Sequence, residues 1–133
     1  MPDAVADTHA QIWYLANDPR LSPLASRYFD ECETDGGQIR VPTICAIEII
    51  YLSEKGRIPT DMLSNLRREL AAPDTIFRWA PLDEAVVNAV LSVPRTAVPD
   101  LPDRIIAATA VGLGLPLISR DAKIRNSGVV TVW

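Results

Sequence analysis

Glu48 is the most unusual of the residues in this 133-residue chain that could take part in chemistry. It lies within residues 44–52, a largely apolar stretch with helical spacing, and its turn carries no lysine or arginine. A glutamate on a solvated helix face would have polar neighbours one turn away. The neighbours of Glu48 at those positions are Ile44, Cys45, Tyr51 and Leu52. An unpaired carboxylate in apolar surroundings changes its protonation state, pairs with a cation or binds a metal, so Glu48 is a candidate metal ligand.

Three aspartates, Asp7, Asp103 and Asp121, lie at the ends of other apolar segments. Asp7 and Asp121 follow expected strands and Asp103 opens an expected helix, so at the carboxyl edge of a parallel sheet all would converge with Glu48. A simpler interpretation stays open, because Asp7 and Asp121 could just cap the helices that follow them. Asp103 lies three residues after Asp100, which is the spacing of a capping box. Capping cannot account for Glu48.

A cluster made of carboxylates suits hard, oxygen-seeking cations, here Mg²⁺ or Mn²⁺. Crowded acids repel one another without metal, which raises the pKa of at least one of them. One ion could generate a nucleophilic hydroxide, and two could also stabilise the leaving oxygen of a phosphodiester; the sequence does not choose between them. His9 is the only histidine, which excludes the usual zinc hydrolases. Cys32 and Cys45 lack the spacing of a zinc or redox motif and are expected to be structural thiols.

Polar residues beside the four acids could help to orient them. Thr8 and Ser119 can hydrogen-bond to carboxylates or to water near the ion. Asp100 is expected to act first as a helix cap and second as an auxiliary ligand. His9 follows Asp7 by two positions in the same helix, so its side chain is expected to point sideways and to stay outside the site.

The basic residues leave a nucleic-acid substrate open without favouring it. The formal net charge of −4 argues weakly against such a partner, but four acids committed to metal would leave the remaining surface near neutral. Arginine dominates the 13 basic residues and is the better bidentate phosphate ligand. Arg104, Arg120 and Lys123 lie near the acids in sequence and could hold substrate phosphates, although arginine beside an acid is usually just a solvated charge.

Hydrophobic periodicity predicts strands that alternate with helices along the whole chain. The strands are expected at residues 4–6, 39–41, 75–79, 115–118 and 129–133. The helices are expected at 8–16, 23–32, 44–55 with Thr43 as cap, 62–71, 84–91 and 100–114, with a short helix from Ala122. Short strands that are apolar on both faces indicate one α/β domain over residues 1–133, with a central parallel sheet flanked by helices on both faces. No membrane span or signal peptide is evident, so a cytoplasmic protein is expected.

Four segments of the chain resemble PIN-domain proteins, in particular the VapC-type toxins of bacterial toxin–antitoxin pairs. The segments are Ala6–Ala10, Ile44–Ile49, Asp100–Ala110 and Leu117–Asp121, and residues 18–22 and 129–133 are also similar to that group. Each motif is weak by itself, but the four in this order are specific. The resemblance covers essentially the whole chain.

This resemblance implies a Mg²⁺-dependent endoribonuclease, with Mn²⁺ as a substitute, that hydrolyses RNA phosphodiesters by metal-activated water. Asp7, Glu48, Asp103 and Asp121 correspond to the acids of the family. It also implies a homodimer, for which the apolar early helices offer some support, and a small cognate antitoxin whose C-terminal segment occupies the acidic groove. Two features depart from the pattern, namely the acidic net charge and the additional carboxylate of Asp100.

Two other functions compete with the nuclease. A catalytically silent PIN-like module could use its acidic groove to capture a basic partner peptide, which would need no metal geometry. A small phosphatase with Asp7 as nucleophile fits less well, because it would want a second aspartate two residues later, where His9 stands.

Overall fold

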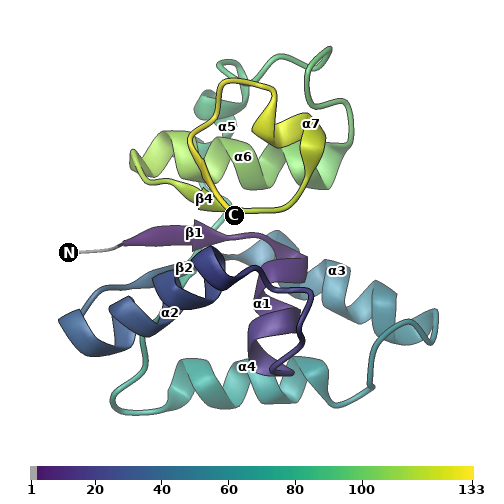
Figure 1. Ribbon diagram of the computed structural model, residues 1–133. Helices are drawn as coiled ribbons and strands as arrows, with labels where there is room; N and C mark the ends of the chain where they lie inside the picture. The colour runs from purple at the N-terminus through teal and green to yellow at the C-terminus, as the bar shows by residue number, and fades with distance from the viewer. Residues whose placement is uncertain (1–2) are drawn as a thin grey trace.

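The computed structural model describes residues 3–133, in which five strands and seven helices follow one another (Figure 1). The strands are β1 (Ala4–Ala6), β2 (Ile39–Pro42), β3 (Phe77–Ala80), β4 (Leu117–Ile118) and β5 (Thr131–Val132). The helices are α1 (Thr8–Leu15), α2 (Pro23–Asp35), α3 (Thr43–Glu54), α4 (Met62–Ala71), α5 (Glu84–Val90), α6 (Leu101–Leu113) and α7 (Ala122–Arg125). Residues 1 and 2 of the expected domain lie outside the described residues. Within 3–133 no helix is long and apolar enough to cross a bilayer.

All five strands are parallel and lie in the order β3-β2-β1-β4-β5. Strands β2 and β3 lie in turn on one side of β1, and β4 and then β5 lie on its other side. The strand order therefore reverses between β1 and β4, and the carboxyl ends of these two strands flank the crevice where open α/β sheets bind ligands. The expected α/β class, with a central parallel sheet, is confirmed.

Two hydrophobic cores cover the two faces of the sheet. Side chains alternate along a strand, so Ala4 and Ala6 face one core while Val5 faces the other. The first core packs against α1, α2 and α4, and the second against α5, α6 and α7, as the two groups of helices in Figure 1 show. Helix α3 contributes to both, with Ile49 in the first core and Cys45 in the second. Its position between the cores brings its N-terminal half beside α6.

Local side-chain bonds explain most of the element boundaries. Ser22 caps α2, since its hydroxyl accepts a hydrogen bond from the N–H of Ala25 at 3.1 Å. β3 begins two residues later than expected because the Thr75 hydroxyl accepts a bond from the N–H of Phe77 at 3.0 Å, which makes a turn there. Thr43 was expected to cap α3, and this is wrong. It is the first residue of α3, and its Oγ1 accepts a bond from the N–H of Leu82 at 3.3 Å.

Both cysteines are structural, as expected from their spacing. Cys32 and Cys45 are buried in the two cores. Burial raises the pKa of Cys32 to about 11 and also raises the pKa of Cys45. Both side chains are therefore neutral thiols at physiological pH, and neither is suited to metal binding or nucleophilic chemistry.

Candidate active site

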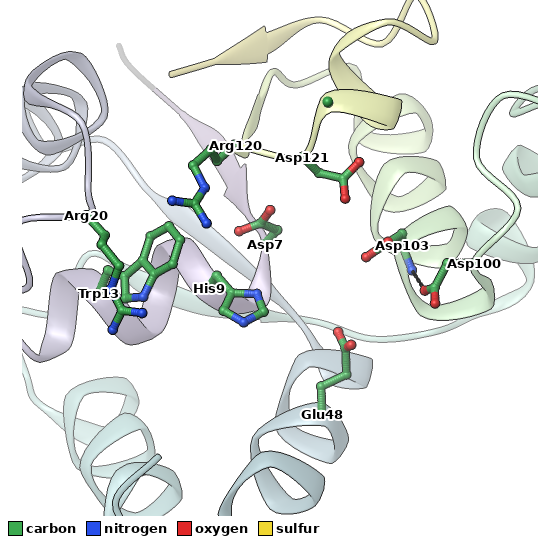
Figure 2. Close-up of a pocket in the computed structure, with 10 residues that line it drawn as sticks. Asp7, His9, Trp13, Arg20, Glu48, Asp100, Asp103, Arg120 and Asp121 are labelled. Atoms are coloured by element: carbon green, nitrogen blue, oxygen red, sulfur yellow. Dashed lines mark hydrogen bonds between the residues drawn. The ribbon is translucent and has the colours of Figure 1, made fainter. Parts of the chain in front are cut away.

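A cavity of about 570 Å³ lies at the carboxyl ends of β1 and β4, next to the N-termini of α1, α6 and α7. Figure 2 shows the side chains that line it. Its acidic residues are Asp7, Glu48, Asp100, Asp103 and Asp121. Its other lining residues are His9, Trp13, Arg20, Arg120 and Ala122. The structure thus brings together the four acids singled out in the sequence, from four separate segments of the chain.

Asp7 and Asp121 are held by the helices that they cap. Asp7 directly follows β1, and its Oδ1 accepts a hydrogen bond from the N–H of Ala10 at 2.9 Å. Asp121 is the third residue after β4, and its Oδ1 accepts a bond from the N–H of Ile124 at 2.9 Å. The capping interpretation and the cavity interpretation therefore both hold for these residues. Each cap engages one carboxylate oxygen, which leaves Oδ2 outside the capping bond.

Glu48 reaches the cavity from the sixth position of α3. Its Oε1 accepts a hydrogen bond of 2.6 Å from the hydroxyl of Thr8, which is itself buried. The apolar neighbours of Glu48 reflect burial only in part, contrary to the expectation from the sequence, since Cys45 is buried but Tyr51 is exposed. Ile47 is 51% exposed and Tyr51 is 59% exposed, so α3 presents an apolar surface beside the cavity.

Asp103 experiences the crowding of the acids most strongly. Burial is the main cause that raises its pKa to about 7, and the charges of Asp100, Asp121, Glu48 and Asp7 add to it. Asp100 also caps α6, since its Oδ1 accepts a bond from the N–H of Asp103 at 3.0 Å, as the first expectation for this residue required. The prediction that crowding raises at least one pKa is confirmed.

Ser119 connects the acids at the ends of the two central strands. It is fully buried, and its Oγ accepts a hydrogen bond from the N–H of Asp121 at 3.1 Å. Burial raises the pKa of Asp7, while hydrogen bonds from Ser119 and from the backbone of Ala10 oppose that rise. Thr8 and Ser119 thus contact the carboxylates that they were expected to orient.

Of the three basic residues expected to hold phosphate, only Arg120 lines the cavity. Arg104 is engaged elsewhere, because its Nε donates to the carbonyl of Val93 at 2.8 Å and its Nη2 to the carbonyl of Val90 at 3.2 Å. These bonds tie α6 to the end of α5, and Arg104 is not part of the cavity lining. Lys123 is exposed on α7 and is not part of the cavity lining.

Trp13 and Arg20 line the cavity although the sequence did not single them out, and His9, which was expected to stay outside the site, lines it too. His9 and Trp13 are four positions apart on α1, and their rings lie 5.4 Å apart between centroids. That spacing puts them on one helix face and could have identified them together. Arg20 reaches the cavity because residues 16–22 turn back along α1. Hydrophobic periodicity does not predict the path of such an irregular segment.

The donor set of the cavity fits a divalent cation of the Mg²⁺ type. All five acids offer oxygen, and the raised pKa values of Asp7 and Asp103 show that their negative charge is poorly compensated. As they lie, however, no three His, Cys, Asp or Glu side chains of residues 3–133 come close enough together to hold one ion. Binding of a metal here would therefore require the carboxylates to move together.

Replacement of Asp103 by asparagine is expected to stabilise the metal-free protein at alkaline pH. Since the folded-state pKa is about 7 and the ordinary value is 3.8, the charge of Asp103 opposes folding more strongly as pH rises through this window. In chelator at pH 8 the variant should gain about 1–2 kcal/mol in unfolding free energy, after a discount for solvent screening, and the gain should vanish near pH 4. Urea unfolding of Asp103→Asn and of the control Asp74→Asn measures this. A gain that does not change with pH would contradict the crowding.

Comparison with known proteins places this geometry in a family. The family model described as PIN domain matches residues 4–129. The protein is 29% identical to Ribonuclease VapC22 of Mycobacterium tuberculosis over 138 aligned positions that cover all of both chains.

Several solved structures share the fold at low sequence identity. VapBC2 from Rickettsia felis, bound to a promoter DNA fragment, has a TM-score of 0.70 and 14% identity, and the match covers 97% of this chain and 96% of that one. A toxin–antitoxin complex from Klebsiella pneumoniae has a TM-score of 0.66 and 21% identity, with coverage of 98% of this chain and 96% of that one. FitAcB from Neisseria gonorrhoeae has a TM-score of 0.64 and 20% identity, with coverage of 96% of this chain and 95% of that one. Identities this low speak for the fold alone. Because the family model spans nearly the entire sequence, the chain belongs to the PIN-domain family.

Proposed function

We propose that this protein is a metal-dependent endoribonuclease and the toxin of a toxin–antitoxin pair, with one nuclease domain over residues 1–133. The observation that carries the proposal is the meeting of Asp7, Glu48, Asp103 and Asp121 in one cavity at the switch point of the sheet. The name of the relative VapC22 as a ribonuclease and the toxin–antitoxin complexes among the similar structures support it. We place the activity in the cytoplasm, where RNA is available.

The four acids Asp7, Glu48, Asp103 and Asp121 would hold Mg²⁺, or Mn²⁺ in its place. The ion would withdraw charge from the phosphodiester and activate a water molecule for attack. The chain's own contribution is positional: helix caps hold Asp7 and Asp121, and the hydroxyl of Thr8 holds Glu48. Asp100 fixes the first turn of α6 and stands as an auxiliary ligand.

The purified protein, free of antitoxin, is expected to cut structured RNA with Mg²⁺ or Mn²⁺ and to stop when chelator is added. Asp7→Asn keeps the size and the capping oxygen but removes the charge, so kcat/KM should fall by at least about 100-fold with the fold intact. Gel assays of RNA cleavage and circular dichroism measure the two effects. Asp74→Asn serves as the matched control. Cleavage by Asp7→Asn at the parent rate would contradict the assignment.

The second candidate is the silent binding module, favoured by the splayed carboxylates, which do not form a metal site as they lie. Its acidic cavity would capture a basic peptide without catalysis. Titration calorimetry with Mn²⁺ separates the two functions. A nuclease should take up Mn²⁺ in an Asp103-dependent way, with a stoichiometry that distinguishes one ion from two, whereas a pure binding module should take up none.

Replacement of Thr8 by valine is expected to weaken Mn²⁺ binding about 10-fold, because it removes the donor that orients Glu48 without a change in volume. Thr8→Ser keeps the hydroxyl and should bind Mn²⁺ almost as the parent does. The same calorimetric titration measures both variants. Equal affinities for Thr8→Val and the parent would mean that Glu48 is not a ligand.

The cognate antitoxin would cover the acidic cavity and a neighbouring apolar groove. This groove of about 290 Å³ shares His9 and Glu48 with the cavity. Its remaining lining residues are Ile44, Ile47, Tyr51, Leu52, Lys55 and Pro102. An acidic pocket beside an apolar groove suits an amphipathic segment with a basic residue, such as an arginine that reaches the carboxylates.

A homodimer remains part of the proposal, but two large apolar side chains of the early helices, Trp13 and Tyr14, are not free to form it. Trp13 is 4% exposed, and Tyr14 stacks on Phe29 with ring centroids 4.2 Å apart, so both serve the core. Leu91 and Leu101, at the end of α5 and the start of α6, are 82% and 67% exposed and offer an apolar surface instead.

Light scattering at micromolar concentration is expected to give the mass of a dimer, and Leu91→Glu should shift it toward the monomer, since it places a charge in the apolar contact. The exposed polar substitution Arg67→Gln on α4 is the control and should remain dimeric. A parent protein that scatters as a monomer would contradict the dimer and leave the nuclease proposal intact.

A further inference from the structure

The cavity has a basic side that faces its acidic side. Figure 2 shows Arg20, Arg120 and His9 gathered around Trp13, while the carboxylates of Asp103 and Asp121 lie across the cavity from them. The metal chemistry proposed above uses the acidic side alone. The basic residues therefore have no role in that metal chemistry.

Among the described residues, Arg120 is a cation of this side that lacks a hydrogen bond and an ion pair. Its guanidinium carbon lies over the Trp13 ring, 4.6 Å from the centroid, a cation–π contact that engages none of its N–H donors in a hydrogen bond. In residues 3–133 the Arg120 side chain forms no hydrogen bond and no ion pair, even though carboxylates share its cavity. Five N–H donors in a planar fork are thus available at the edge of the cavity.

The other two residues of the basic side are weaker candidates than Arg120. Arg20 also lies over Trp13, at 5.1 Å, but Asp18 binds its guanidinium in a bidentate pair with N–O distances of 3.1 and 2.8 Å. Its charge is therefore largely offset within its own loop. His9 is exposed and leans against the Trp13 ring. Within residues 3–133, Arg120 is thus left as the arginine of the basic side that forms neither a hydrogen bond nor an ion pair.

Trp13 is a fixed support for Arg120. The indole is 4% exposed and belongs to the core, and its ring packs against Trp133 with centroids 5.8 Å apart. Trp133 follows β5, so the contact between the two indole rings joins α1 to the segment after β5. A guanidinium that lies on a buried aromatic ring keeps its orientation at lower entropic cost than a free surface arginine.

We propose that Arg120, held on Trp13, binds an RNA phosphate next to the one that is cleaved, and that Trp13 is its positioning residue. The inference rests on the proposed function, since the acidic side must hold the scissile phosphate. A strand across the cavity then offers its next phosphate to the basic side, where a planar fork accepts phosphate oxygens in pairs. Single-stranded RNA is the class of substrate segment that this arrangement fits, because its backbone can bend within one cavity.

The direct test is binding of a fluorescein-labelled single-stranded oligouridine of about 12 nucleotides in chelator, where cleavage is absent. Arg120→Gln is expected to weaken binding roughly 10-fold at low salt. It should also reduce the slope of log K against log salt by about 0.7, the value for one phosphate contact on a single strand. Arg120→Lys keeps the charge but not the fork, so it should keep the slope and recover only part of the affinity. Arg67→Gln, on α4 away from the cavity, controls for the loss of one positive charge.

Trp13 variants test the positioning role by a readout that simple destabilisation does not give. Trp13→Phe keeps an aromatic face and should retain most of the binding, while Trp13→Leu should reproduce the affinity and salt slope of Arg120→Gln. In the double variant Trp13→Leu/Arg120→Gln the losses should not add, because both act through one contact. In the cleavage assay, Arg120→Gln should raise KM and change kcat little. If Trp13→Leu does not fold, Arg120→Gln and Trp13→Phe still decide the proposal.

The outcomes separate this inference from the proposed function. A parent that binds and cuts RNA, with unchanged affinity and salt slope in Arg120→Gln, would overturn the phosphate site and leave the nuclease standing. A fall in kcat with unchanged binding would also overturn it, since Arg120 would then act on the reacting phosphate itself. A parent that neither binds nor cuts RNA would remove both proposals.

Discussion

Repulsion between carboxylates is the constraint on which the rest of this structure depends. Five acids share one cavity, and burial together with their charges raises the pKa of Asp103 to about 7. Nothing in the interaction of these acids with one another can hold them there, so the surrounding fold must do it. The parallel pairing of β1 with β4 brings Asp7 and Asp121 to the same edge. The packing of α3 beside α6 does the same for Glu48 and Asp103.

Hydrogen bonds at helix caps hold three of the five acids in place against this repulsion. Asp7, Asp100 and Asp121 each accept a hydrogen bond from the N–H three residues later. At α1 and α6 the cap also sets the carboxylate against the positive end of a helix dipole, which is worth about 0.3–1 kcal/mol. Capping therefore does not exclude the ligand role proposed for these acids. Each cap engages one oxygen of the acid and leaves the other outside the capping bond.

Periodicity and topology rules predicted the alternation of elements and the convergence of the acids, because both follow from which residues can be buried and from the direction of parallel strands. They failed where a side chain's direction depends on a loop. Arg104 turns to the carbonyls at the end of α5, and Arg20 returns to Trp13 through an irregular segment. Glu48 shows a subtler limit. Its apolar neighbours were a correct sign of something unusual, but Ile47 and Tyr51 are exposed and not buried.

The acidic net charge, which argued against an RNA substrate, is a poor guide here because the charge is unevenly distributed. Much of the negative charge lies in the cavity, and two divalent ions bound there would bring the formal net charge from −4 to zero. Such a protein has no broad positive field to steer RNA toward it. A nuclease of the proposed kind would then hold RNA through few contacts at the cavity itself, and its affinity would depend only shallowly on salt. An arginine fixed on a buried tryptophan makes more sense on such a surface than on a basic one, where any loose cation would serve.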